Sequence, residues 1–189
     1  MPQPPILPKI DWETVFESGL DYLEWIEAGE SPENQDKMEN IRQSLILEPQ
    51  IAAFLEALPC PIHVVAIAED WCGDVVRHVP VLERLAETAP NLKVRYISRG
   101  QWPEVFVRFL TNGGEAIPKF IFLNETFTEC GNWGPMPRLC GDIIARGKAC
   151  GDIGAARKKV SGIYEADHNK RLVLDELLHL IDIASSREP

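Results

Sequence analysis

The chain has 189 residues, of which 45% are hydrophobic and 25% are charged, and its formal net charge at pH 7 is −10. This composition is typical of a globular domain that is large enough to bury its own core. The negative charge argues against nucleic acid or an anionic membrane as the main partner, and no run approaches the roughly 18 apolar residues that a membrane-spanning helix needs.

The first residues and the cysteine content indicate a reducing compartment. The opening "MPQPPILPKI" lacks the basic start and the long apolar run of a signal peptide. The five cysteines are an odd number and are widely spaced, which fits free thiols better than a disulfide framework. We therefore expect a cytoplasmic protein.

The charge is unevenly distributed along the chain. Residues 1–59 hold twelve Asp or Glu and three Lys or Arg, whereas residues 137–171 hold four acidic and eight basic residues. We expect the acidic segment to lie near the basic one. Two separate solvated faces would explain the same charges.

Three helices are predicted before the first strand. Residues 12–26 place large apolar side chains at helical spacing, with Asp11 as the cap and Gly29 as the end. Residues 31–48 favour a second helix. Pro49 then ends that helix and begins a third, because proline is tolerated only in the first turn.

Residues 61–137 alternate between strands and helices. The apolar run "PIHVVAIAED" (61–70) is typical of a strand buried on both faces. The remaining segments in chain order are a helix from about Cys72 to Thr88 with Pro80 inside it, a strand at 92–98, a short helix within 103–114, a hairpin of strands 118–123 and 126–130, and a loop at 131–137.

The rest of the chain favours helices that are interrupted near residues 167–170. The order of elements predicts an α/β fold, with a mixed central sheet flanked by helices.

Several short features occur in a fixed order along the chain. They are Trp71-Cys72-Gly73 directly after the first strand, Pro80 eight residues after Cys72, Ile117-Pro118 at the start of the third strand, and Gly131 after the last strand. Together they resemble the thioredoxin superfamily, and most of all its uncharacterised thioredoxin-like members with extra N- and C-terminal helices. The resemblance implies a thioredoxin-like fold with a cis peptide bond before Pro118.

The resemblance also implies the domain organisation. We expect one thioredoxin-like domain over residues 1–189. It divides into a helical extension (1–60), a thioredoxin-like core (61–150) and a C-terminal helical extension (151–189).

The chain departs from the family pattern at two positions. Val75 replaces the second active-site cysteine, and Ala66 replaces a buried acid that assists the second thiol in the family. The two losses belong together, and they argue against a dithiol reductase.

The chemistry that remains depends on Cys72. Its place at the start of a helix favours the thiolate, because unpaired backbone N–H groups and the helix dipole stabilise negative charge. Glu69, Asp70 and Asp74 would oppose this effect. The resemblance implies that Cys72 is the catalytic residue and that the groove beside it is lined by Trp71, Gly73, Asp74, Ile117, Pro118, Gly131 and Trp133.

Two functions from different classes fit this site. The first is a monothiol oxidoreductase: Cys72 forms a mixed disulfide with a protein or peptide substrate, and a low-molecular-weight thiol such as glutathione resolves it. Cys130 is an internal candidate for the resolving thiol, although a strand cysteine is more often a small buried hydrophobe. The second is a non-catalytic module that binds a peptide or protein, with Cys72 inert. Trp133 could equally cover the core under its loop.

We expect neither a cofactor nor a metal. The sequence has no C-x-x-C pair and no closely spaced pair of histidines.

Overall fold

A computed structural model describes residues 7–188 of the chain, and its centre is a four-stranded mixed sheet in the order β2-β1-β3-β4. β1 pairs with β2 in parallel and with β3 antiparallel, and β3 pairs antiparallel with β4. This arrangement confirms the predicted α/β class. The strand bounds are β1 Ile62–Ile67, β2 Leu92–Ile97, β3 Lys119–Leu123 and β4 Glu129–Trp133.

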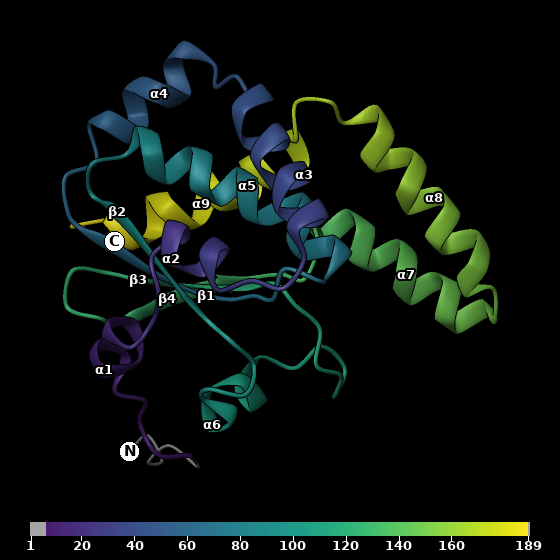
Figure 1. Cartoon of the computed structure of the whole chain (residues 1–189), viewed down its shortest axis with the longest axis horizontal. Coiled ribbons are helices and arrows are strands. Elements are labelled where there is room, and N and C mark those ends of the chain that lie inside the picture. Colours follow the sequence, from purple (N-terminus) through teal and green to yellow (C-terminus); the bar gives the residue numbers. More distant parts are fainter. Residues whose placement is uncertain (1–6, 189) are drawn as a thin grey trace.

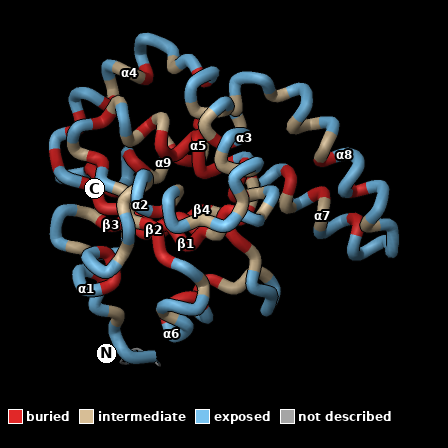
Figure 2. The backbone as a smooth tube through the Cα atoms, viewed as in Figure 1, coloured by how far each residue is buried: buried red, intermediate tan, exposed pale blue. Residues whose placement is uncertain are grey.

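Helices cover both faces of this sheet. α5 and α9 lie on one face, and α1 and α6 lie on the other (Figure 1). All residues of β1 and β3 are buried as a result (Figure 2), and for β1 this agrees with the predicted burial on both faces. The helix bounds are α1 Trp12–Glu17, α2 Tyr22–Glu27, α3 Pro32–Ser44, α4 Pro49–Glu56, α5 Gly73–Thr88, α6 Pro103–Phe106 with a 3-10 turn at Val107–Phe109, α7 Arg138–Cys150, α8 Ile153–Ala166 and α9 Arg171–Ser185.

The single helix predicted over residues 12–26 is wrong, since the segment forms α1 and α2 with an extended break between them. Leu20 in this break exchanges two backbone hydrogen bonds with Tyr96 of β2, of 2.9 and 2.8 Å. Asp21 then starts α2 through a capping box with Glu24. Pairing with the edge strand therefore overrides helical periodicity, and the capping box restarts the helix. The predicted cap of α1 by Asp11 is confirmed.

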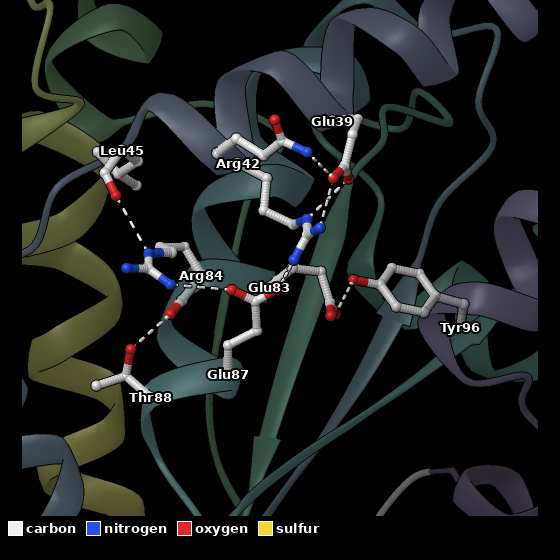
Figure 3. Close-up of polar contacts among 9 residues, drawn as sticks. Glu39, Arg42, Leu45, Glu83, Arg84, Glu87, Thr88 and Tyr96 are labelled. Carbon is white, nitrogen blue, oxygen red and sulfur yellow. Dashed lines mark hydrogen bonds and ion pairs between the residues drawn. The ribbon is translucent and has the colours of Figure 1, made fainter.

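The N-terminal helix α3 is fastened to α5 by a polar network (Figure 3). Arg42 of α3 bonds to Glu39 on its own helix and forms an ion pair with Glu87 of α5. Arg84 of α5 donates a 3.1 Å hydrogen bond to the carbonyl oxygen of Leu45. The helix that begins at Cys72 is thus held by the N-terminal extension as well as by the sheet.

The hairpin between β3 and β4 differs from its prediction. The second strand was expected at 126–130, but it spans Glu129–Trp133. The Asn124 side chain accepts backbone N–H groups from Thr126 and Thr128, at 3.0 and 2.9 Å, and Phe127 has a left-handed φ of 57°. These bonds lengthen the turn to Thr128, because an Asn side chain can replace backbone pairing in a turn.

Helices α7 and α8 form a hairpin that projects from the body of the molecule (Figure 1) and is mostly exposed (Figure 2). Gly151 ends α7 in the left-handed conformation, with φ 78°. The two helices enclose a small cluster of buried residues of their own: Cys140, Ile143, Ala156 and Val160.

The predicted interruption near 167–170 is confirmed as the turn between α8 and α9. Within residues 7–188, an ion pair of 3.0 Å between Arg171 and Glu48 joins this turn to the acidic N-terminal segment, and it is the one ion pair that links residues 137–171 to that segment. Ion pairing between the two segments in the described residues is therefore confined to this turn.

Candidate functional site

Cys72 lies beside the Ile117–Pro118 peptide bond, which is cis. The Cys72 thiol donates a hydrogen bond to the carbonyl oxygen of Ile117, with a sulfur–oxygen distance of 3.5 Å. The sheet produces this contact, because Ile67 at the end of β1 pairs with Lys119 at the start of β3. The chain leaving β1 therefore meets the chain entering β3, as the sequence predicts.

The thiol occupies the N-cap position of α5 and is partly exposed. No side chain caps this helix, so the backbone N–H groups of its first turn are available around Cys72. A Cβ at Gly73 would meet no atom within 4 Å, so the approach past Gly73 is open. Val75 is fully buried and presents a hydrocarbon side chain where the family has its second thiol.

Glu69 is paired with Arg99, a cation that the sequence pattern does not reveal. Arg99 forms an ion pair of 3.2 Å with Glu69 and lies 5.1 Å from the centre of the Trp71 ring. The pKa of Arg99 is raised, chiefly by its hydrogen bond with Glu69, and Cys72 contributes in the same direction. The position of Arg99 could have been predicted from the strand order. Arg99 follows β2, and because parallel strands end at the same edge of a sheet, it lies near the residues that follow β1.

Asp70 fastens the N-terminal extension to the turn that carries Cys72. Its buried carboxylate accepts hydrogen bonds from the backbone N–H of Ser31 (2.7 Å) and from Gln35 (3.1 Å). Its carbonyl oxygen accepts a third bond from Asn34 at 3.0 Å. Gly29 permits this approach, since a Cβ there would lie 2.5 Å from the Asp70 carboxylate. Asp70 thus acts as an anchor for α3.

Trp71 contributes to a different cleft from the one expected. Its side chain is 53% exposed and donates a 2.8 Å hydrogen bond to Glu69. It lines a cleft of about 450 Å³ next to α2, together with Trp25 and Tyr96. Cys72 is not among the residues that line this cleft. Trp71 therefore borders the N-terminal extension across this cleft.

Asp74 lies on the other side of the turn, toward α7 and α8. Burial raises the pKa of its carboxyl group, and Arg77 partly offsets this effect. The three carboxylates that were expected to oppose ionisation of Cys72 are therefore in three different settings: Glu69 is paired, Asp70 is bonded to α3, and Asp74 is half-buried beside a cation.

The predicted role of Gly131 at the site is wrong. Gly131 lies within β4 opposite Phe122, where a Cβ would meet the Leu180 side chain of α9 at 2.8 Å. The glycine beside the cis bond is Gly134, whose φ is 117°. A Cβ at Gly134 would collide with the Pro118 carbonyl oxygen. The misplaced strand 126–130 caused this error.

The prediction of Cys130 as a resolving thiol is also wrong. Cys130 lies in β4 between the partners of Leu123 and Phe122, at the end of β3 remote from Pro118. About four residues of strand, roughly 13 Å, separate the two positions, whereas a disulfide needs Cα atoms within about 7 Å. Burial also raises the pKa of the Cys130 thiol.

Trp133 covers the core. The prediction that it lines the binding groove is therefore wrong, and the alternative, that it covers the core under its loop, is correct. The side chain is 5% exposed and stacks on Phe120 at 5.3 Å. Its indole N–H donates a 2.6 Å hydrogen bond to Glu176 of α9.

Lys119 is a further residue that the sequence did not reveal. Its buried ammonium group donates hydrogen bonds to the Thr111 hydroxyl (2.9 Å) and the Gly134 carbonyl (2.7 Å). Burial lowers the pKa of Lys119. The side chain thereby joins the segments on either side of Pro118.

Two classes of site are not found in the part of the chain that the structure describes. Within residues 7–188 no group of three or more His, Cys, Asp or Glu side chains is placed to hold a metal ion. Among the same residues no helix has the length and apolar character needed to cross a membrane.

Comparisons with known proteins agree with this fold. A 1.5 Å crystal structure of a protein of unknown function from Pseudomonas aeruginosa has a TM-score of 0.63 and 22% identity, covering 84% of this chain and 99% of that one. The crystal structure of an HIV epitope scaffold gives a TM-score of 0.62 and 21% identity, covering 83% of this chain and 99% of that one. No curated protein matches. A family model described as Thioredoxin matches residues 19–149, and the chain therefore belongs to the thioredoxin family.

Proposed function

We propose that this protein carries out thiol–disulfide exchange through one cysteine, Cys72. The observation that carries the proposal is the position of its sulfur, at the open start of α5 and 3.5 Å from the carbonyl oxygen that precedes the cis Pro118. A nucleophile and an exposed stretch of backbone are then adjacent. Backbone groups beside a cis proline can pair with an extended peptide, which would hold a substrate disulfide next to the sulfur.

The reaction needs two exchange steps. In the first, the Cys72 thiolate attacks one sulfur of a substrate disulfide, a new disulfide forms to Cys72, and the other substrate sulfur leaves as a thiolate. In the second, an external thiolate attacks the mixed disulfide, joins the substrate sulfur and releases the Cys72 thiolate. The external thiol supplies the electrons.

The resolving thiol comes from outside the chain in this proposal. Val75 has no sulfur, and Cys130 lies at the remote end of β3. A low-molecular-weight thiol such as glutathione fits this role, and the reducing cytoplasm is the compartment that supplies it.

Alkylation rates test the proposal directly. Cys150 is an exposed thiol at the end of α7 and serves as the internal reference, whereas Cys140 is buried and would react slowly in any case. We expect Cys72 to react at least about ten times faster than Cys150 at pH 7, because a thiolate and not a thiol is the nucleophile. Peptide mass spectrometry across a pH series measures both rates in one sample.

The Cys72→Ser variant is the loss-of-function control for thiol exchange. With oxidised glutathione as the disulfide, it should abolish the mixed disulfide that Cys72 forms while leaving the melting temperature unchanged, because the side chain is partly exposed and Ser is also accepted at an N-cap. Alkylation of Cys72 no faster than Cys150, together with no mixed disulfide, would overturn the proposal. The alternative, a thioredoxin-fold module that binds a peptide without chemistry, would then remain.

A further inference from the structure

A second cleft, of about 400 Å³, separates the first turns of α5 from the α7–α8 hairpin. We name it the basic cleft. Its volume lies within the range of sites that bind small ligands or a few side chains. The residues that line it are Asp74, Arg77, Met136, Ile144, Lys148, Ile153, Arg157, Val160, Ser161 and Tyr164.

Three exposed cations surround the basic cleft: Arg77 of α5, Lys148 of α7 and Arg157 of α8. Within residues 7–188 none of the three forms an ion pair. One carboxyl group, Asp74, lies among them, and burial raises its pKa. The cleft therefore gathers positive charge in a chain whose net charge is −10, and it is complementary to an anion.

The floor of the basic cleft is suited to a peptide more than to a simple ion. Met136, Ile144 and Val160 supply apolar surface, and Tyr164 supports the guanidinium of Arg77, which lies 5.1 Å from its ring centre. The remaining hydroxyl, on Ser161, bonds to Glu165 at 3.1 Å. Cations above an apolar floor match the charged ends and the methylene groups of Asp and Glu side chains.

The basic cleft adjoins the thiol. Asp74 and Arg77 lie two and five residues after Cys72, so Arg77 is about 7.5 Å further along the axis of α5. On the other wall, Met136 follows Gly134, the glycine packed against Pro118. An extended peptide advances about 3.3 Å per residue. A substrate cysteine at Cys72 would thus place its neighbours, two to four residues away, in the basic cleft.

We propose that the basic cleft binds an acidic segment of the disulfide substrate, two to four residues from the cysteine that Cys72 attacks. This rests on the proposed thiol exchange and names its substrate class: protein or peptide disulfides flanked by Asp or Glu. Arg77, Lys148 and Arg157 hold the acidic side chains, and the sulfur chemistry stays at Cys72.

Binding is tested without any sulfur chemistry. The probe is a fluorescent six-residue peptide of Asp, Glu and Ala without cysteine, titrated into Cys72→Ser protein and followed by anisotropy. We expect saturable binding that weakens with added salt, and no binding by the same peptide with Asn and Gln. Both measurements use the basic cleft without any substitution in it.

Matched variants locate the binding. A triple variant should bind the acidic peptide with about ten-fold lower affinity, since each exposed ion pair contributes a factor of about two or three. It combines Arg77→Gln, Lys148→Gln and Arg157→Gln. The control combines Arg138→Gln, Arg146→Gln and Lys158→Gln, which removes the same charge from exposed positions of the hairpin outside the cleft. We expect its affinity to change less than about two-fold.

Several results would overturn the inference: no binding of the acidic peptide, equal weakening by both triple variants, or displacement of the peptide by inorganic phosphate or a single-stranded oligonucleotide at lower concentration. A neutral disulfide, bis(2-hydroxyethyl) disulfide, tests Cys72 of the unmodified protein separately. If the protein exchanges with this compound but does not bind the peptide, only the inference about the basic cleft is wrong. If it binds the peptide but shows no exchange, the proposed thiol exchange is wrong.

Discussion

The thiol of Cys72 donates its hydrogen bond to the carbonyl oxygen of Ile117, the group that precedes the cis bond to Pro118. This bond exists only while the sulfur is protonated, because a thiolate has no hydrogen to donate. In the proposed exchange, ionisation of Cys72 would therefore free the Ile117 carbonyl to accept an N–H group from the substrate peptide. The attacking sulfur and the proposed docking group would then become available in the same step.

Arg99 should promote the reactivity of Cys72. We expect Arg99→Gln to slow alkylation of Cys72 at pH 7 by about two- to five-fold, because it removes a cation held beside the turn that carries Cys72 and leaves Glu69 unpaired. The control is Arg95→Gln, which removes an arginine from β2 that lies 3.9 Å from Asp21. An unchanged or faster reaction in Arg99→Gln, measured by mass spectrometry, would show that Glu69 already cancels this cation.

Val75→Cys should restore a dithiol. Residues 72 and 75 lie within one turn at the start of α5, where two Cα atoms are close enough for a disulfide. We expect an internal disulfide after oxidation, at a cost of about 1 kcal/mol in the reduced protein for the buried methyl group that is lost. Disulfide-reductase activity should be weak because Ala66 provides no acid. Mass spectrometry of the oxidised protein detects the bond, and two free thiols at these positions would contradict this geometry.

Gly134→Ala should destabilise the fold and impair the site. The residue has φ 117°, and a Cβ there would collide with the Pro118 carbonyl oxygen, so we expect a loss of at least about 2 kcal/mol in the free energy of unfolding. Gly141→Ala in α7 is the matched control, since its Cβ would meet nothing within 4 Å; it should be neutral or stabilising by up to about 1 kcal/mol. Urea unfolding measures both, and equal effects would show that the Pro118 contact is unimportant.

Glu83 should make stability depend on pH. Burial raises the pKa of Glu83 from 4.5 to about 7, although hydrogen bonding by Tyr96 and the charge of Arg42 oppose the shift. The native state therefore keeps a proton that the unfolded chain releases between these two values, so this group makes stability fall as the pH rises through that window.

Glu83→Gln should remove this contribution. The Gln side chain can still accept the 2.5 Å hydrogen bond from Tyr96, but it cannot ionise. We expect the variant to gain up to about 3 kcal/mol over the parent above about pH 7 and little below about pH 4.5. Urea unfolding at a series of pH values measures the difference. A constant offset, or the same pattern in the exposed control Glu56→Gln, would contradict the assignment.

The sequence was most informative where a local pattern and the sheet agree. The apolar run of β1, the helix after Cys72 and the proline before β3 place the thiol beside Pro118, and all three are readable from short stretches. Prediction failed where side chains far apart in sequence decide the outcome. Leu20 pairs with Tyr96 and breaks a helix that periodicity favours, and the Asn124 side chain lengthens a turn.

The lengthened turn explains the errors at the site. It shifts β4 by three residues, which carries Cys130 and Gly131 away from Cys72 and brings Gly134 to Pro118. Arg99 and Lys119 stayed hidden for another reason. A charged residue near a strand end is ordinarily a solvated surface residue, and only the folded chain shows that one lies over Trp71 and the other between two loops.

The bonds of Ser31 and Gln35 to Asp70 couple the N-terminal segment to the turn that carries Cys72. Asp70 and Cys72 are separated by a single residue, so the turn that carries the sulfur cannot shift unless Ser31 and Gln35 release their carboxylate. If Cys72 carries out the proposed exchange, a partner that displaces α3 should therefore change the exchange rate without touching the sulfur itself.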